Sequence, residues 1–147
     1  MKVMLPMIRI ANVVMIYVRL WDRINSKYRS MLITCDTGAS VTTIDSVILR
    51  KLGYDTSAGD RHKIITASGS NYIRSVFLDM KISEIEHEQF TDREVFFRDF
   101  EVHAHTFPAE SYSMGVLGLN AFERFDSVNF VFGKNQILFT ITNSVSH

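Results

Sequence analysis

One stretch of the chain, from Met31 to Val41, constrains the fold more than any other. Apolar residues without charge lead into Asp36, which is followed by a hydroxyl residue, a glycine and two small residues. This pattern predicts a buried strand that stops in a tight loop and presents one carboxylate. Burying a lone carboxylate is costly unless it is paired, and acids in such positions are often catalytic. An ordinary strand-end turn, in which Asp36 hydrogen-bonds its own backbone, is the alternative interpretation of Asp-Thr-Gly alone.

Two motifs in this order resemble the retropepsin-like aspartic peptidases. The first is Asp-Thr-Gly-Ala-Ser at 36–40, which is similar to the active-site loop of that family. The second is Val-Leu-Gly at 116–118 with the helix-like segment 120–125, which resembles the segment that packs under this loop. The resemblance runs from about Tyr17 to Ile141. It implies a mostly β fold, a closed barrel or sandwich with one or two short helices and a flap hairpin, active as a homodimer.

The resemblance also implies roles for the residues of the first motif. Asp36 is the expected catalytic residue, and Thr37, Gly38 and Ala39 are expected to support the active-site loop. Thr37 would brace two such loops through its hydroxyl, and Gly38 would allow their close approach. Peptide hydrolysis of this kind uses two carboxyl groups, yet the sequence has no second Asp-Thr-Gly or Asp-Ser-Gly. An active enzyme must therefore be a homodimer, in which one Asp36 from each subunit meets across a two-fold axis.

A pair of strand-like segments predicts the flap. Residues 62–67 and 72–78 flank Ser-Gly-Ser-Asn at 68–71, which indicates a β-hairpin with a flexible tip. By resemblance this hairpin folds over a bound peptide and excludes water. The expected substrate-binding residues of the flap and cleft are Ala67, Ser68, Gly69, Ser70 and Val116. Without the Asp36 loop, a surface hairpin with no ligand would be the better interpretation.

These features predict an aspartic endopeptidase that hydrolyses peptide bonds with a water activated by the two Asp36 carboxyl groups. An apolar cleft should favour extended peptide substrates with hydrophobic side chains at the cut; its expected residues include Ile44, Ile64, Ile65 and Val116. The alternative is a non-catalytic dimeric module of the same fold that binds peptides or assembles. Two departures from viral relatives favour it: Gly69 is the only glycine at the flap tip, and Ser40 and Val41 replace acidic residues.

The remaining pattern predicts mainly strands. The segments expected as strands are 13–21, 31–35, 41–44, 100–105, 114–118, 128–132 and 136–141. Alternation directs Phe100, Val102 and Ala104 to one side of their strand. The charged segment 81–92 predicts a second, solvated hairpin around residues 84–88.

Two short helices are expected between the strands. Asp45 can cap the first, which Gly53 ends; its apolar face contains Ile48, Leu49 and Leu52. Asn120 and Glu123 have the character of a capping box that starts the second helix. Gly118, immediately before it, is expected to let the backbone pass close to the active-site loop.

Two histidines suggest a possible metal site. His103 and His105 are two residues apart on a predicted strand, so they project to the same side. A zinc site needs three or four ligands, and no cysteine pair or His-Glu-x-x-His pattern accompanies these two. An exposed strand face is therefore the favoured interpretation, and neither a metal nor a cofactor is expected.

Size and composition set the broad class. At 147 residues and 46% hydrophobic content, the chain fits a single domain over residues 1–147, with 1–12 as an N-terminal extension. Lys+Arg and Asp+Glu both number 16, so no nucleic-acid partner is expected. Cys35 is the only cysteine, which excludes an internal disulfide and fits a reducing, cytoplasmic compartment. It is expected to be a small buried hydrophobe rather than a reactive thiol.

The N-terminal residues 1–10 are apolar, but Pro6 and Arg9 interrupt them. They form neither the ~20-residue span of a membrane helix nor a signal peptide. A soluble protein with no integral membrane segment is expected, and a peripheral contact through the Met-rich end is left open. In the family the chain ends supply an intersubunit sheet, for which this segment and the strand ending near Ile141 are candidates.

Overall fold

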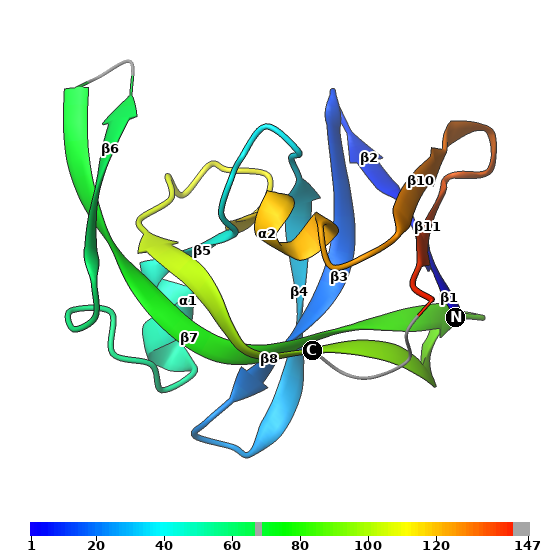
Figure 1. The fold of residues 1–147 in the computed structure, drawn as a ribbon, viewed down its shortest axis with the longest axis horizontal. Helices are drawn as coiled ribbons and strands as arrows, with labels where there is room; N and C mark the ends of the chain where they lie inside the picture. Colours follow the sequence, from blue (N-terminus) through cyan, green and yellow to red (C-terminus); the bar gives the residue numbers. More distant parts are fainter. Residues whose placement is uncertain (67–68, 143–147) are drawn as a thin grey trace.

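The computed structural model describes residues 1–66 and 69–142, which fold mainly into β-strands (Figure 1). The strands are β1 (Lys2–Pro6), β2 (Ile8–Ile10), β3 (Val13–Asp22), β4 (Lys27–Cys35), β5 (Thr43–Asp45), β6 (Arg61–Thr66), β7 (Gly69–Glu86), β8 (Gln89–His105), β9 (Gly115–Leu117), β10 (Ser127–Val131) and β11 (Gln136–Thr140). The helices are α1 (Ser46–Lys51), α2 (Leu119–Phe122) and the 3-10 turn η1 (Phe132–Lys134). The expected mostly β fold with short helices is confirmed.

The larger sheet closes on itself. Among the described residues its eight strands follow the order β2-β3-β4-β9-β5-β8-β7-β6. Closure arises because β3 pairs with β4 along one edge and with β7 along the other, where Leu20 stands opposite Met80. In a sheet closed in this way, the inward side chains of all the strands pack together in a shared core. The expected closed barrel is thus confirmed.

The second sheet brings the two ends of the described chain together. It has the order β1-β11-β10, and Lys2 stands opposite Thr140 in the antiparallel β1–β11 pair. The Met1 amino group donates to the Ile141 carbonyl at 2.6 Å, and the Ile141 N–H donates to the Met1 carbonyl at 2.9 Å. The two segments that are candidates for an intersubunit sheet therefore pair with each other within one chain.

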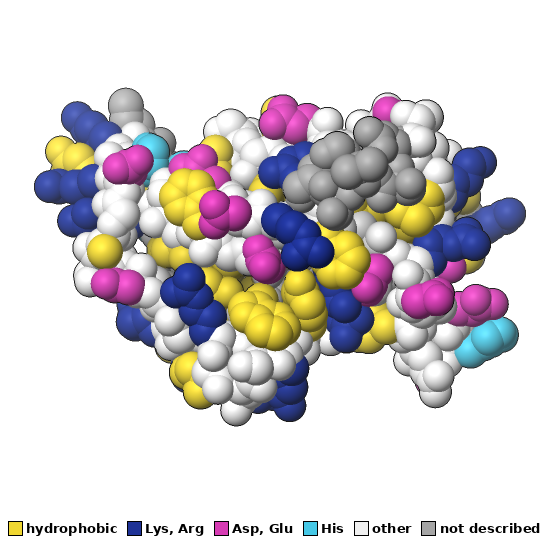
Figure 2. All heavy atoms as spheres, turned by 60° about the horizontal axis from the view of Figure 1, so that its bottom comes forward, with side chains coloured by type: hydrophobic (Ala, Val, Ile, Leu, Met, Phe, Trp, Pro, Cys, Tyr) yellow, Lys and Arg dark blue, Asp and Glu magenta, His cyan; other side chains and the backbone are white. Residues whose placement is uncertain are grey.

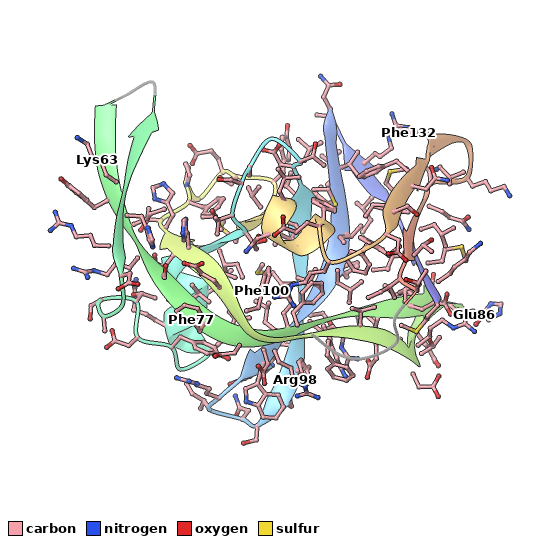
Figure 3. The ribbon with its side chains drawn as sticks, viewed as in Figure 1. Lys63, Phe77, Glu86, Arg98, Phe100 and Phe132 are labelled. Carbon is pink, nitrogen blue, oxygen red and sulfur yellow. The ribbon has the colours of Figure 1, made fainter. Side chains whose placement is uncertain are left out.

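Alternation along β8 determines which of its side chains enter the core. Phe100, Val102 and Ala104 are at most 6% exposed, as the sequence predicts. Figure 3 shows Phe100 pointing into the barrel, whereas Arg98 projects outward. Phe97 is also buried, because an irregularity in the β7–β8 register between these positions inserts one extra residue into β8. The rings of Phe97 and Phe100 then meet edge to face at 5.1 Å.

The second expected hairpin is present, but its first residues do not form a solvated face. β7 and β8 join at residues 87–88, where positive φ angles of 51° and 63° form the turn. Ile82 and Ser83 are fully buried, because β7 is longer than expected and carries them into the core. Lys81 is tolerated beside them because its ammonium group pairs with Glu94 at 3.1 Å. The prediction of a solvated face is wrong there and correct only near the turn.

The first expected helix is confirmed together with its cap. One carboxylate oxygen of Asp45 accepts from the backbone N–H groups of Val47 at 3.1 Å and Ile48 at 3.2 Å. Its other oxygen accepts from Phe107 N–H at 2.9 Å, so this buried acid also fixes the chain after β8. Gly53 ends the helix with a φ of +94°, which a side chain would disfavour.

The surface carries both signs of charge. Figure 2 shows lysine and arginine side chains interspersed with acidic ones over one face, in keeping with the equal totals of 16. The two α-helices in the described part of the chain have six and four residues, so neither is long enough to cross a membrane.

Candidate active site

The Asp36 loop connects β4 to β5 and projects its carboxylate to solvent in the single chain. The Asp36 carboxylate accepts a hydrogen bond from Gly38 N–H at 2.9 Å, and the Asp36 carbonyl accepts one from Ala39 N–H at 3.2 Å. The strand-end turn considered for this motif is therefore present, and it fixes the carboxylate. A Cβ at Gly38 would lie 3.1 Å from the same carboxylate oxygen, so glycine leaves room for it. Thr37 is exposed beside it.

The segment β9–α2 supports this loop from below. The Asp36 N–H donates to the Leu117 carbonyl at 3.0 Å, and the Leu119 N–H donates to the Ala39 carbonyl at 2.8 Å. A Cβ on Gly118, between these two contacts, would lie 2.8 Å from the Ala39 oxygen and 2.8 Å from a backbone carbon of Val41. Distances below about 3 Å to backbone atoms require the chain to shift. The close approach predicted for Gly118 is thus confirmed.

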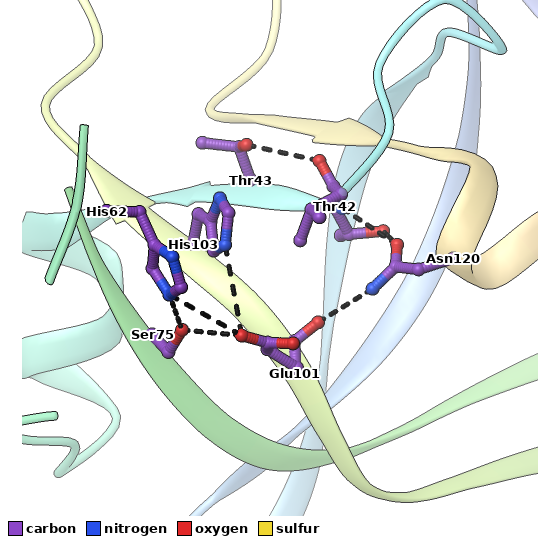
Figure 4. Close-up of polar contacts among 8 residues, drawn as sticks. Thr42, Thr43, His62, Ser75, Glu101, His103 and Asn120 are labelled. Carbon is purple, nitrogen blue, oxygen red and sulfur yellow. Dashed lines mark hydrogen bonds and ion pairs between the residues drawn. The ribbon is translucent and has the colours of Figure 1, made fainter. Parts of the chain in front are cut away.

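Thr42 and Asn120 connect the loop to α2 (Figure 4). The Thr42 hydroxyl accepts from Gly118 N–H at 3.1 Å and donates to Asn120 Oδ1 at 2.8 Å. The Thr42 N–H donates to the same oxygen at 2.8 Å, and Asn120 Nδ2 donates to the Glu101 carbonyl at 2.9 Å. The capping box predicted for Asn120 and Glu123 is therefore wrong. The helix cap is Gly118, without a side-chain bond, because the Asn120 side chain is already bonded to Thr42 and to the Glu101 carbonyl of β8.

Changing Thr42 to valine should destabilise the protein by about 1–3 kcal/mol, because the buried Gly118 N–H would lose its acceptor. Thr43→Val is the matched control, since the Thr43 hydroxyl makes a long 3.4 Å contact with the Val41 carbonyl on the partly exposed face. That control should change the free energy of unfolding by less than about 0.5 kcal/mol. Urea denaturation of the two variants measures the difference. Equal stabilities would contradict the bracing role of Thr42.

Val116 lies next to the loop as predicted from the second motif. It stands opposite Thr34 on β4 and Thr43 on β5, which brings it beside the strand that ends in the Asp36 loop. Ile44 was expected to line the cleft with it, and this expectation is wrong. Ile44 is fully buried, because the alternation of β5 turns it into the core and gives the other face to Thr43.

The hairpin expected to be the flap is formed by β6 and the start of β7. The two strands pair antiparallel from Arg61 opposite Arg74 to Thr66 opposite Gly69. Ala67 and Ser68 lie outside the described residues, as do the side chains of the other residues predicted to contact a substrate or line the cleft on this hairpin, Ser70, Ile64 and Ile65. Only the backbone of Gly69 and Ser70 is described, in β7.

Cys35, immediately before Asp36, behaves as the expected buried hydrophobe. It is partly buried and packs against the core. Burial raises the pKa of the Cys35 thiol to about 12. The neutral thiol therefore prevails at physiological pH, and the residue lacks the thiolate that a nucleophile needs.

The two histidines of β8 pack against different neighbours. His103 stacks on His62 of β6 with ring centroids 4.7 Å apart, and both face Glu101. Burial, with a smaller contribution from His62, lowers the pKa of His103. The ring of His105 instead lies edge to face with that of Phe107, with ring centroids 6.0 Å apart. Among the described residues, the group with suitable spacing for a metal ion is His62, Glu101 and His103.

The fold and the loop define the class of protein: a closed β-barrel with an Asp-Thr-Gly loop held on an apolar-apolar-Gly strand is retropepsin-like. The chain is similar to a retropepsin-like aspartic protease from Rickettsia conorii, with a TM-score of 0.63 and 18% identity over 96% of this chain and 91% of that one. It is also similar to the retroviral protease-like domain of Ddi1 from Leishmania major, with a TM-score of 0.45 and 15% identity over 88% and 89% of the respective chains.

The family follows from the sequence match. The profile of the family described as aspartyl protease matches residues 23–121, about two thirds of the chain, and the chain belongs to this family. The match includes both the Asp36 loop and the Gly118 segment beneath it. No protein with a curated description matches the chain.

Proposed function

We propose that the protein is an aspartic endopeptidase that works as a homodimer. The observation that supports this most strongly is the geometry of the Asp36 loop. Its carboxylate accepts a hydrogen bond from the Gly38 N–H at 2.9 Å and is exposed at the end of β4. The chain also belongs to the aspartyl protease family. A rigid carboxylate at the surface of one subunit is suited to meet its counterpart from another.

The proposed reaction is hydrolysis of a peptide bond by an activated water. One Asp36 carboxylate takes a proton from the water while the water oxygen attacks the peptide carbonyl carbon. The other Asp36, in its acid form, donates a proton to the carbonyl oxygen. Collapse of the tetrahedral intermediate breaks the carbon–nitrogen bond, and the amine leaves with a proton from the dyad. Aspartic proteases are the general example of two carboxyl groups that share one proton in this way.

The dimer is required because each chain supplies one such loop. Thr37 is exposed beside Asp36, so its hydroxyl is available to brace the partner's loop, and Gly38 adds no side chain that would hold the two loops apart. The β1-β11-β10 sheet has β1 and β10 as its edges. The side chains of Glu84 and Arg93 already bond the backbone of β1, at the Met4 N–H and the Lys2 carbonyl. In the described part of the chain β10 pairs with β11 alone, and such an edge strand can add a strand from a second copy. These features support pairing through the loops and the chain ends.

The proposed substrate is an extended peptide or protein segment. Val116 and Thr43 share one sheet face beside the Asp36 strand, and Val116 offers an apolar contact to a hydrophobic side chain at the cut. The β6–β7 hairpin would cover the bound peptide as a flap and exclude water. We also propose a cytoplasmic location, because a lone cysteine fits a reducing compartment.

Digestion of a broad peptide library at acidic and neutral pH tests the proposal. We expect products cut between hydrophobic residues, formed by the wild-type protein and absent with Asp36→Asn. The competing function, a dimeric module that binds peptides without cutting, is favoured by the single glycine at the hairpin tip. It predicts peptide retention without any Asp36-dependent product at either pH, and that result would overturn the enzymatic proposal.

A further inference from the structure

Four polar side chains gather where β6, β7 and β8 lie side by side (Figure 4). The Nε2 atoms of His62 and His103 lie 3.8 Å and 3.9 Å from the same atom, Oε2 of Glu101. The Ser75 hydroxyl donates to that Oε2 at 2.6 Å and lies 2.7 Å from His62 Nε2. We refer to His62, Glu101 and His103 as the His–Glu cluster. None of the functions proposed above uses it.

The strands hold the His–Glu cluster in place. The His103 N–H donates to the Thr42 carbonyl at 2.8 Å, and the Glu101 carbonyl accepts from Asn120 at 2.9 Å, so the β8 backbone is fixed at both residues. Ser75 is buried, and its bond orients the Glu101 carboxylate toward the two rings. One nitrogen or oxygen atom from each of the three cluster residues lies within 4.8 Å of the others. The cluster is therefore preorganised by regular structure rather than by loops.

We infer that the His–Glu cluster is a binding site for a divalent cation of the zinc class. Zinc takes imidazole nitrogen and carboxylate oxygen ligands in a tetrahedral arrangement, and two histidines with one glutamate leave a fourth position for water. Calcium and magnesium prefer oxygen ligands alone, so the two imidazoles disfavour them. This ligand set differs from the pair considered from sequence, because His62 and Glu101 take the place of His105.

Two of the three distances between ligand atoms are close to those of a zinc site, and the third, between the two histidines, is at most 4.8 Å. With bonds of about 2.0–2.1 Å to a tetrahedral zinc ion, neighbouring ligand atoms lie about 3.4 Å apart. The two histidine–glutamate separations of 3.8 Å and 3.9 Å exceed this value by a small amount, which rotations of the side chains can remove. His62 Nε2 would exchange its 2.7 Å hydrogen bond with the Ser75 hydroxyl for the ion. That hydroxyl would remain beside the Glu101 carboxylate as its hydrogen-bonding partner, the usual arrangement around a zinc ligand.

A bound ion would join β6 to β8 across β7. Because His62 lies on the β6–β7 hairpin and His103 on the barrel strand β8, the ion would cross-link the hairpin to the barrel. The cluster shares no residue with the Asp36 loop. Zinc binding and peptide cleavage can therefore be tested separately, and the Asp36→Asn variant should bind zinc as tightly as the wild-type protein.

Competition with a chromophoric chelator near neutral pH measures the affinity of the full, untagged chain for zinc chloride. We expect one ion per chain. His62→Gln and His103→Gln should each weaken binding by at least about 100-fold, and Ser75→Ala, which removes a partner of a ligand, by about tenfold. Cobalt chloride in place of zinc should give the visible absorption of a tetrahedral ion in the wild-type protein and not in the two histidine variants.

The matched control is His87→Gln. His87 lies 3.8 Å from Glu86, much as the cluster histidines lie from Glu101, but its side chain is 92% exposed. This variant should bind zinc like the wild-type protein. Circular dichroism without metal checks the folding of every variant, and His62, at 39% side-chain exposure, is the substitution least expected to disturb it. Wild-type binding no tighter than that of a folded His62→Gln variant, or an equal loss in His87→Gln, would overturn the inference.

Discussion

Replacing Asp36 with asparagine should abolish peptide cleavage and leave the fold and the proposed dimer intact. The asparagine side chain has the same shape, and its oxygen can still accept the 2.9 Å bond from Gly38 N–H. It cannot act as the general base that activates water or as the acid that protonates the carbonyl oxygen. Each of these contributions is worth about 10²–10⁴-fold in rate, so activity should fall below detection in a fluorogenic peptide assay.

The control for this variant is Asp92→Asn, which neutralises an exposed acid on β8 and should retain full activity. Mixing the wild-type protein with an excess of Asp36→Asn should inhibit cleavage, because a mixed dimer has one carboxyl group where two are needed. Circular dichroism and size-exclusion chromatography check fold and assembly. Undiminished cleavage by Asp36→Asn would show that this acid is not catalytic.

The second large effect is expected for Gly118→Ala. The new Cβ would lie 2.8 Å from the Ala39 carbonyl oxygen and 2.9 Å from that of Val41, both backbone atoms of the Asp36 loop. Relieving this overlap should cost about 1–3 kcal/mol of folding free energy. The melting temperature should fall by about 2–4 °C for each kcal/mol. Because the loop must move, cleavage should also fall, by about 10²-fold for a displacement of about 1 Å.

Gly133→Ala is the matched control, since a Cβ at that turn glycine would meet no atom within 4 Å. Its stability should stay within about 0.5 kcal/mol of the wild type, and its activity should be unchanged. Thermal melts of both variants are compared at one protein concentration, because the proposed dimer would make melting temperatures concentration-dependent. A Gly118→Ala protein with wild-type stability and activity would contradict the close packing of the two segments.

Local patterns in the sequence were sufficient to predict much of the fold. The Asp36 loop, the helix capped by Asp45 and the alternation of Phe100 with its neighbours each depend on residues close together in the chain. Such features follow from turn chemistry, capping and the two-residue period of strands. The contact beneath the loop was predicted as well, because a glycine after two apolar residues marks a place where backbones approach.

Features that depend on pairing between distant segments were not predicted. The β1–β11 pair joins residues 2–6 to 136–140, and no local pattern specifies such a register. Asparagine is a common helix-capping residue, but the side-chain oxygen of Asn120 accepts its hydrogen bonds from Thr42 instead. Tertiary contacts thus overrode the local capping preference, and the helix begins after Gly118 instead.

The His–Glu cluster illustrates the same limit for residues outside the Asp36 loop. His103 was identified as a possible ligand from its strand position, but its partners come from the alignment of β6, β7 and β8. That alignment puts Ser75 opposite His103 and leaves His62 close enough to stack on the same ring. The sequence signal that could have found the cluster is the Glu-x-His spacing of residues 101–103, combined with a third ligand on the hairpin predicted to lie nearby.

The arrangement of subunits in the assembled protein tests the central claim most directly. A crystal structure of the assembled protein should show the two Asp36 carboxyl groups about 3 Å apart across a two-fold axis, as a shared proton requires. A protein that stays monomeric under all conditions would contradict the account. So would a dimer in which the two Asp36 side chains lie far apart and face away from each other.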